Sequence, residues 1–156
     1  MTPASDGAPT PAPGDDARAA LAARCDAVEE AYEFMLAYAA QGLPSDQDSN
    51  AGGQLREFLG RAVEAVSGLA DAYAAAVKQD GLQPADRYQA FLAVLDRDAS
   101  DSLAAIGLVL AQPAISSQLI DNLNASIHLR ALLTDLFLID EIFKLQRNQG
   151  KLASTS

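Results

Sequence analysis

Apolar residues recur at three- and four-residue steps along most of the chain, and this spacing predicts helices. The first such segment carries the repeat from Leu21 through Val28 and Met35 to Ala39. No stretch alternates apolar and polar residues with period two over the length of a strand. The fold class predicted from this pattern is all-α.

Glycine and proline punctuation divides the periodic pattern into four expected helices. Gly42-Leu43-Pro44 ends the first helix, and Gly81-Leu82-Gln83-Pro84 ends the second. A glycine just past a helix readily adopts the left-handed conformation, and a proline beyond it prevents continuation. Pro113 ends the third helix, and the pair Ser116-Ser117 can cap a fourth that runs to Gly150. Four long helices with short connections predict an antiparallel four-helix bundle.

The length of 156 residues is enough for one domain between two short ends. Residues 1–14 are rich in proline, alanine and glycine and lack apolar periodicity, so we expect a disordered tail there. The helical bundle domain is expected over residues 15–150, with a frayed C-terminus at 151–156. The start of the chain lacks the basic and apolar regions of a secretory signal peptide. No segment offers the roughly 20 mostly apolar residues of a membrane-spanning helix.

The charge balance argues against several classes of partner. The chain has 11 basic and 21 acidic residues, a formal net charge of −10. Such a surface repels phosphate backbones, so we expect no nucleic-acid partner, and it equally disfavours docking on anionic lipid. A single cysteine, Cys25, excludes an intramolecular disulfide and favours a reducing compartment, so the expected location is cytoplasmic. Cys25 is in register with Leu21 and Val28, which predicts a core residue.

Residues suited to catalysis or metal binding are scarce. His128 is the only histidine. The segment from Asp46 to Glu57 has oxygen ligands at EF-hand spacing, but Ala51 stands where the calcium loop requires glycine. A polar loop between helices explains the segment better. No glycine-rich phosphate loop, paired cysteine ligands or nucleophile elbow occurs, so we expect no enzyme, no cofactor and no metal site.

One edge of the last expected helix is polar and is predicted to fix the register of the helices. Its most notable member is Asp135, because a carboxylate within an apolar run needs a partner. Arg130, on the same helix, is expected to pair with a carboxylate of another helix, such as Asp98. The predicted polar seam consists of Asp121, Asn124, His128 and Asp135.

The last expected helix is apolar on two opposite sides, and such a helix must be covered nearly all round. In a monomeric four-helix bundle each helix shows only one stripe to the core, so we expect the second side to meet a second copy or another partner. Complete coverage within one chain and an apolar ligand are the alternatives. The first side contains Ile120, Leu123, Ile127, Ala131, Leu138, Ile142 and Leu145. The second side, the expected interface, contains Leu129, Leu132, Leu133, Leu136, Ile139 and Phe143.

These patterns predict a non-enzymatic interaction protein: an accessory, adaptor or assembly-chaperone subunit that self-associates as a homodimer or larger homo-oligomer through its last helix. Phe34 and Tyr38, off the main stripe of the first helix, are candidate partner contacts. On this hypothesis Leu136→Glu dissociates the oligomer and leaves the fold mostly intact. Two alternatives remain: a small helical carrier that binds an apolar molecule between the third and fourth helices, and a coat protein of a hydrophobic particle.

Overall fold

A computed structural model describes residues 13–154, and this part of the chain is all-helical, as predicted. Residues 1–12 of the expected tail and residues 155–156 lie outside the described residues. The first helix begins at Pro13, inside the expected tail, and the last helix continues beyond Gly150 to Ser154. The helices are α1 (Pro13–Ala40), α2 (Asn50–Val66), α3 (Leu69–Asp80), α4 (Ala85–Leu110), α5 (Ser117–Ala125) and α6 (Ile127–Ser154).

Two of the four expected helices are interrupted, so the described residues form six helices. Between α2 and α3, Ser67 is extended and Gly68 is left-handed, with φ of 78°. Between α5 and α6, Ser126 is extended, and its hydroxyl accepts a hydrogen bond from the backbone N–H of Leu129 at 3.3 Å. A serine side chain that caps the next turn offers the backbone an alternative to a continuous helix.

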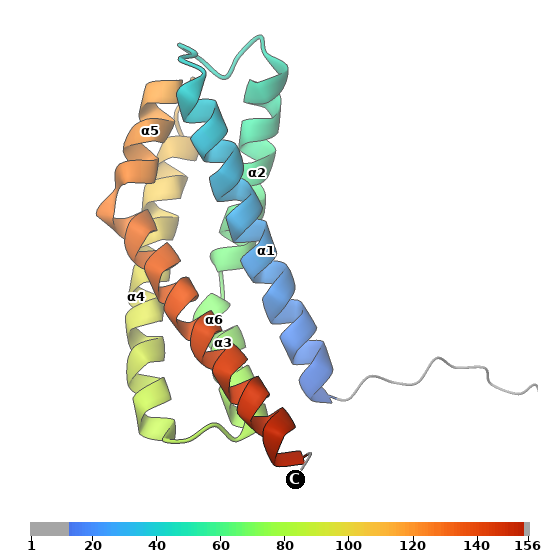
Figure 1. Cartoon of the computed structure of the whole chain (residues 1–156). Helices are drawn as coiled ribbons and strands as arrows, with labels where there is room; N and C mark the ends of the chain where they lie inside the picture. The colour runs from blue at the N-terminus through green and yellow to red at the C-terminus, as the bar shows by residue number, and fades with distance from the viewer. Residues whose placement is uncertain (1–12, 155–156) are drawn as a thin grey trace, which may run out of the picture.

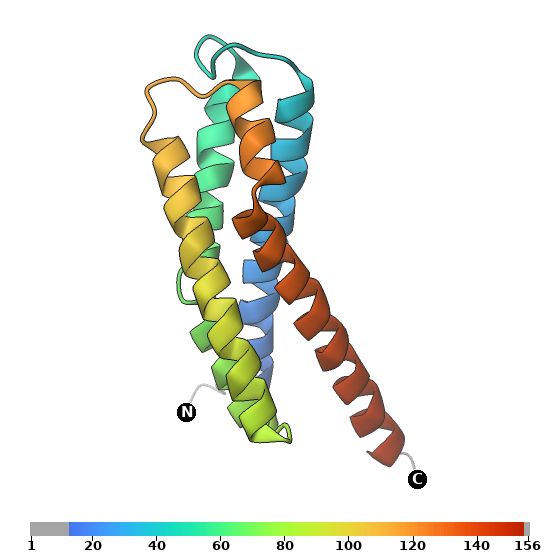
Figure 2. The ribbon, with the colours of Figure 1, turned by 90° about the vertical axis from the view of Figure 1, so that its left-hand side faces the viewer.

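The two interruptions divide the molecule into an upper and a lower half in the orientation of Figure 1. In the upper half α1 packs against α2 and α5, while α4 contacts α2 and α5. In the lower half α3 packs against both α1 and α4, and α6 packs mainly against α4. Figure 2 shows that α6 leans away from the other helices towards its C-terminal end. The lower half is therefore less closed than the upper half.

A buried carboxylate ties the loops together at the upper end. Asp46 accepts hydrogen bonds from Arg56 Nε at 2.6 Å and from the backbone N–H of Ile115 at 2.7 Å. Burial alone would raise the pKa of Asp46, but these hydrogen bonds hold it below its ordinary value. The Arg56 guanidinium also donates to the carbonyls of Leu110 and Gln112. One ion pair thus joins the loop after α1, the start of α2 and the end of α4.

The two aromatic side chains expected to contact a partner are used inside the chain. Tyr38 is fully buried, and its hydroxyl donates to the carbonyl of Ile115 at 2.7 Å. Phe34 is half-buried and stacks on Phe58, with ring centroids 4.6 Å apart. Tyr38 is therefore part of the upper-end hydrogen-bond network, and Phe34 packs between α1 and α2.

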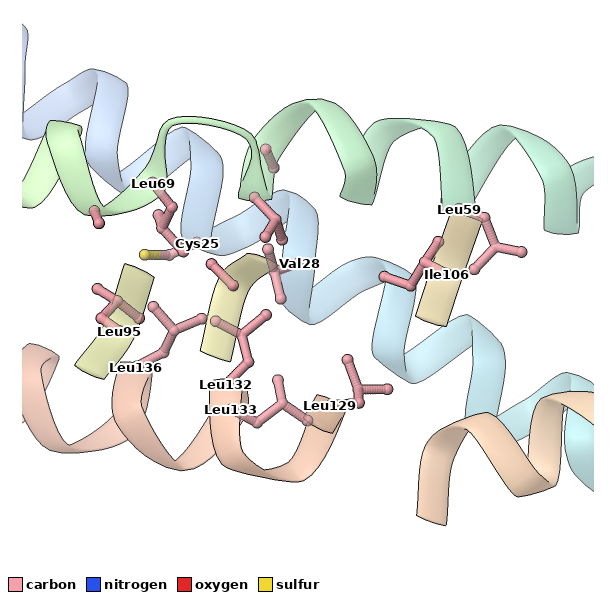
Figure 3. Packing of buried hydrophobic residues seen from close by; sticks show 14 of the residues in the cluster. Cys25, Val28, Leu59, Leu69, Leu95, Ile106, Leu129, Leu132, Leu133 and Leu136 are labelled. Atoms are coloured by element: carbon pink, nitrogen blue, oxygen red, sulfur yellow. The ribbon is translucent and has the colours of Figure 1, made fainter. Parts of the chain in front are cut away.

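The side of the last helix that was expected to be an interface lies in the core of the single chain. The interruption at Ser126 redirects α6, so that this side faces the other helices (Figure 3). Phe143 is half-buried, with its ring edge-on to Tyr73 at 5.5 Å between centroids. Complete coverage within one chain therefore explains this side of the helix. The buried members are Leu129, Leu132, Leu133, Leu136 and Ile139.

Leu136→Glu is consequently expected to unfold the protein rather than to dissociate an oligomer. The Leu136 side chain is only 4% exposed, and a buried unpaired carboxylate costs more than about 4 kcal/mol. Leu138→Glu, two positions along on the exposed side, is the matched control and should keep its helicity. Thermal unfolding followed by circular dichroism distinguishes the two, and an unchanged melting temperature for Leu136→Glu would contradict its placement in the core.

Candidate functional site

The divergence of α6 from α1 opens a groove of about 650 Å³ in the lower half of the molecule. We call it the α1–α6 groove. Its apolar lining includes Leu21, Leu82 and Phe143. An ion pair between Arg18 and Asp80, with 2.8 Å between nitrogen and oxygen, lies along its border. The volume lies within the range typical of small-molecule sites.

Both walls of the α1–α6 groove carry charged residues. The α1 wall carries two acids, Asp26 and Glu29, together with Arg18, and the α6 wall carries two bases, Lys144 and Arg147, together with Asp140. Between them lies an apolar floor, so the groove suits a molecule with an apolar body and a polar group at its edge.

Three side chains from α1, α3 and α6 form a hydrogen-bonded chain beside this groove. The Tyr73 hydroxyl donates to Asp140 Oδ1 at 2.5 Å, and Cys25 Sγ lies 3.1 Å from the same hydroxyl. Because Tyr73 gives its only proton to the carboxylate, the Cys25 thiol is the donor to Tyr73. Burial raises the pKa of Cys25 to about 11, so the group is a thiol at neutral pH. Burial also raises the pKa of Tyr73.

This chain of side chains joins three helices but does not form a nucleophilic centre. A cysteine attacks as the thiolate, and the raised pKa of Cys25 keeps the thiolate population very low. As predicted, Cys25 is part of the core. The three hydrogen-bonded side chains, Cys25, Tyr73 and Asp140, therefore act as a polar link that holds α6 to α1 and α3 across the α1–α6 groove.

The predicted polar seam is divided by the interruption at Ser126. Asp121 and His128 are exposed, whereas Asn124 and Asp135 are buried. Neither side-chain polar atom of Asn124 has a hydrogen-bond partner among the described residues. The His128 carbonyl accepts from the hydroxyl of Ser102 on α4 at 2.9 Å. The four residues therefore do not form one continuous edge.

Asp135 faces another acid across the contact between α4 and α6. Burial, together with the neighbouring Asp98 carboxyl, raises the pKa of Asp135 to about 7. Asp135 Oδ2 has no hydrogen-bond partner among the described residues. Two adjacent carboxyl groups of this kind share one proton below that pH. Arg130, expected to pair with Asp98, is instead exposed and forms no ion pair with another described residue.

The exposed side of α6 carries a row of apolar residues, which we call the outer stripe. Ile127, Leu138 and Leu145 are its most exposed members, at 76%, 51% and 52%. Ala131 and Ile142 complete the row and are half-buried. At its upper end, Ile127 and Ala131 help to line a depression of about 480 Å³.

Along α6 the two sides have the opposite roles from those expected, because the second side is buried and the first side carries the outer stripe. Ile120 and Leu123, the members of the first side that lie in α5, are buried. Polar residues do not distinguish the two sides of α6 in the sequence, since Thr134 and Glu141 interrupt the exposed side while Asp135 and Asp140 lie among the buried and half-buried positions of the helix.

Asp46, the first residue of the segment considered for calcium, is committed elsewhere, since both of its carboxylate oxygens accept hydrogen bonds within the protein. Residues 13–154 contain no group of three or more histidine, cysteine or acidic side chains arranged to hold a metal ion. None of the helices in that range has the length and apolarity needed to cross a bilayer. Comparisons with protein-family models, curated proteins and solved structures give no match.

The paired acids predict a specific pH dependence of stability. Because the pKa of Asp135 is raised above its ordinary value of 3.8, folding favours the protonated form. This contribution to the free energy of unfolding is complete below pH 3.8 and is lost as the pH rises through about 7. Asp135→Asn removes one of the two facing charges and offers an amide N–H to the Asp98 carboxylate, so it should raise the melting temperature at pH 8 by about 3–6 °C.

Melting curves of wild type and Asp135→Asn between pH 5 and pH 8 test this prediction. The difference should shrink towards pH 5, where the wild-type pair holds its proton. Asp101→Asn, at an exposed position of α4, is the matched control and should leave the pH profile unchanged. Parallel profiles for wild type and Asp135→Asn would show that the two acids do not share a proton.

Proposed function

We propose that the protein is a non-enzymatic interaction protein, an accessory, adaptor or assembly-chaperone subunit, that self-associates through α6. The observation that carries the proposal is the outer stripe, where three large apolar side chains are at least half exposed on one helix. Large apolar side chains gathered on the exposed side of one helix often mark a protein contact. In this proposal the six helices act as four antiparallel rods, with α2–α3 and α5–α6 each forming one rod.

Two further features support an interaction role. Cys25, the one cysteine, is held as a thiol, which argues against thiol chemistry at the α1–α6 groove. The net charge of −10 repels unintended partners and keeps the protein dispersed, so a contact through an apolar surface can be selective. The proposed location is the cytoplasm, because a lone buried thiol suits a reducing compartment.

Leu138→Glu tests the proposal directly. A carboxylate in the middle of the outer stripe should abolish association, because burying it in an apolar contact costs several kcal/mol. The measurement is molar mass by light scattering at several protein concentrations. Leu108→Glu provides a matched control, since Leu108 is an exposed leucine on α4, and this variant should associate as the wild type does. A wild-type protein that stays monomeric at every concentration would refute self-association.

The α1–α6 groove supports a second candidate function, a carrier of a small molecule with an apolar body. The volume of about 650 Å³ and the apolar lining favour this candidate, in which the ligand would lie between α1 and α6. The sequence had suggested a site between the third and fourth expected helices instead.

Native mass spectrometry of freshly purified protein tests the carrier function. The wild type should show added mass from a co-purified ligand, and Ala22→Trp should lose it, because Ala22 lines the groove and a larger side chain fills it. Since Ala22 is exposed, the variant should remain folded. Wild-type protein without added mass, or equal added mass in both proteins, would count against a ligand in this groove.

A further inference from the structure

Two opposite charges border the outer stripe along the same edge of α6. Arg130 and Glu141 are both exposed, and neither forms an ion pair with another described residue. Eleven positions are close to three helical turns, so the two side chains project in nearly the same direction, about 16 Å apart along the axis. That separation is too large for a pair within one helix.

A second α6 running in the opposite direction would satisfy both charges at once. In an antiparallel pair related by a two-fold axis, the edge of one helix that carries Arg130 and Glu141 lies beside the same edge of the other helix. We infer that the outer stripe binds a second copy of this chain in antiparallel orientation, with Arg130 of each copy paired to Glu141 of the other. The inference deepens the proposed function and rests on it, because it names the partner and the register of the same surface.

The register set by these charges also matches the apolar residues. Pairing Arg130 with Glu141 places the two-fold axis between positions 135 and 136. Ile127 then lies within one residue step of the level of Leu145 in the other copy, and Leu138 lies within one residue step of the level of Thr134. Each copy therefore contributes the exposed members of the outer stripe, Ile127, Leu138 and Leu145, to the contact, while the small Ala131 allows the helices to approach closely.

A parallel pair fits the same residues less well. In a parallel pair, a residue on this edge faces the residue five positions further along on the opposite edge of the other helix. Arg130 would therefore face Asp135 of the other copy. Asp135 is only 8% exposed and is turned towards Asp98 across the α4 contact. Glu141 would meet Gln146, so neither charge would gain an ion-pair partner. Charge complementarity therefore favours the antiparallel arrangement.

Charge exchange at the two positions tests the register in the full-length protein. Arg130→Glu and Glu141→Arg should each raise the dissociation constant by about tenfold or more, because each replaces two attractive contacts with two repulsive ones. The double variant carrying both changes should return to within about threefold of the wild type. Arg97→Glu, on the exposed surface of α4, controls for the change in net charge. Sedimentation equilibrium supplies the dissociation constants.

A distance measurement reports the orientation independently. A spin label on Asn148→Cys, at an exposed position near the end of α6, should lie about 35–40 Å from its counterpart in an antiparallel pair. A parallel pair would give about 10–15 Å. Cys25 is buried and remains unlabelled.

The outcomes separate this inference from the proposed function. Single variants that associate like the wild type, a double variant that is not restored, or a short label distance would overturn the antiparallel register, while Leu138→Glu would still dissociate the dimer. Wild-type protein that is monomeric throughout would overturn both. Weakened single variants, a restored double variant and a long label distance together support the inference.

Discussion

The extended backbone at Ser126 determines how the C-terminal third of the molecule is arranged. Without it, α5 and α6 would continue as one straight helix. The change of direction leaves α5 against α1 and α6 mainly against α4. The leucine-rich side of α6 is therefore buried, the α1–α6 groove opens, and the outer stripe remains exposed. Both candidate functional surfaces depend on this one interruption.

The two ends of the molecule are held by different chemistry. At the upper end, Asp46 and Arg56 join three segments through an ion pair and several backbone hydrogen bonds. At the lower end, α1 and α6 are connected through hydrogen bonds from Cys25 to Tyr73 of α3 and from Tyr73 to Asp140. Fewer constraints in the lower half allow α6 to diverge, so the apolar groove lies there and not beside the Asp46 network.

The helical fold was predictable, but the helix interruptions and the orientation of the last helix were not. The expected helix ends at Gly42 and Gly81 are confirmed, with φ of 66° and 60°, because glycine at such positions has few alternatives. Serine lowers helix propensity only slightly, so Ser126 gave no comparable indication. Periodicity identifies two apolar sides of a helix but does not tell which one the other helices cover. The groove arises from that choice of packing and has no sequence pattern of its own.

The orientation of α6 is set by apolar burial and not by ion pairing. Had charge pairing decided it, Arg130 would face Asp98, as expected from the sequence. The structure instead brings Asp135 to Asp98 and leaves Arg130 outside. Bringing two acids together costs free energy, and a proton shared between them reduces that cost. Burial of the leucines on the same helix offsets the remainder. Because that choice leaves Arg130 and Glu141 unpaired beside an apolar row, the packing that completes the monomer also creates a surface with complementary charges.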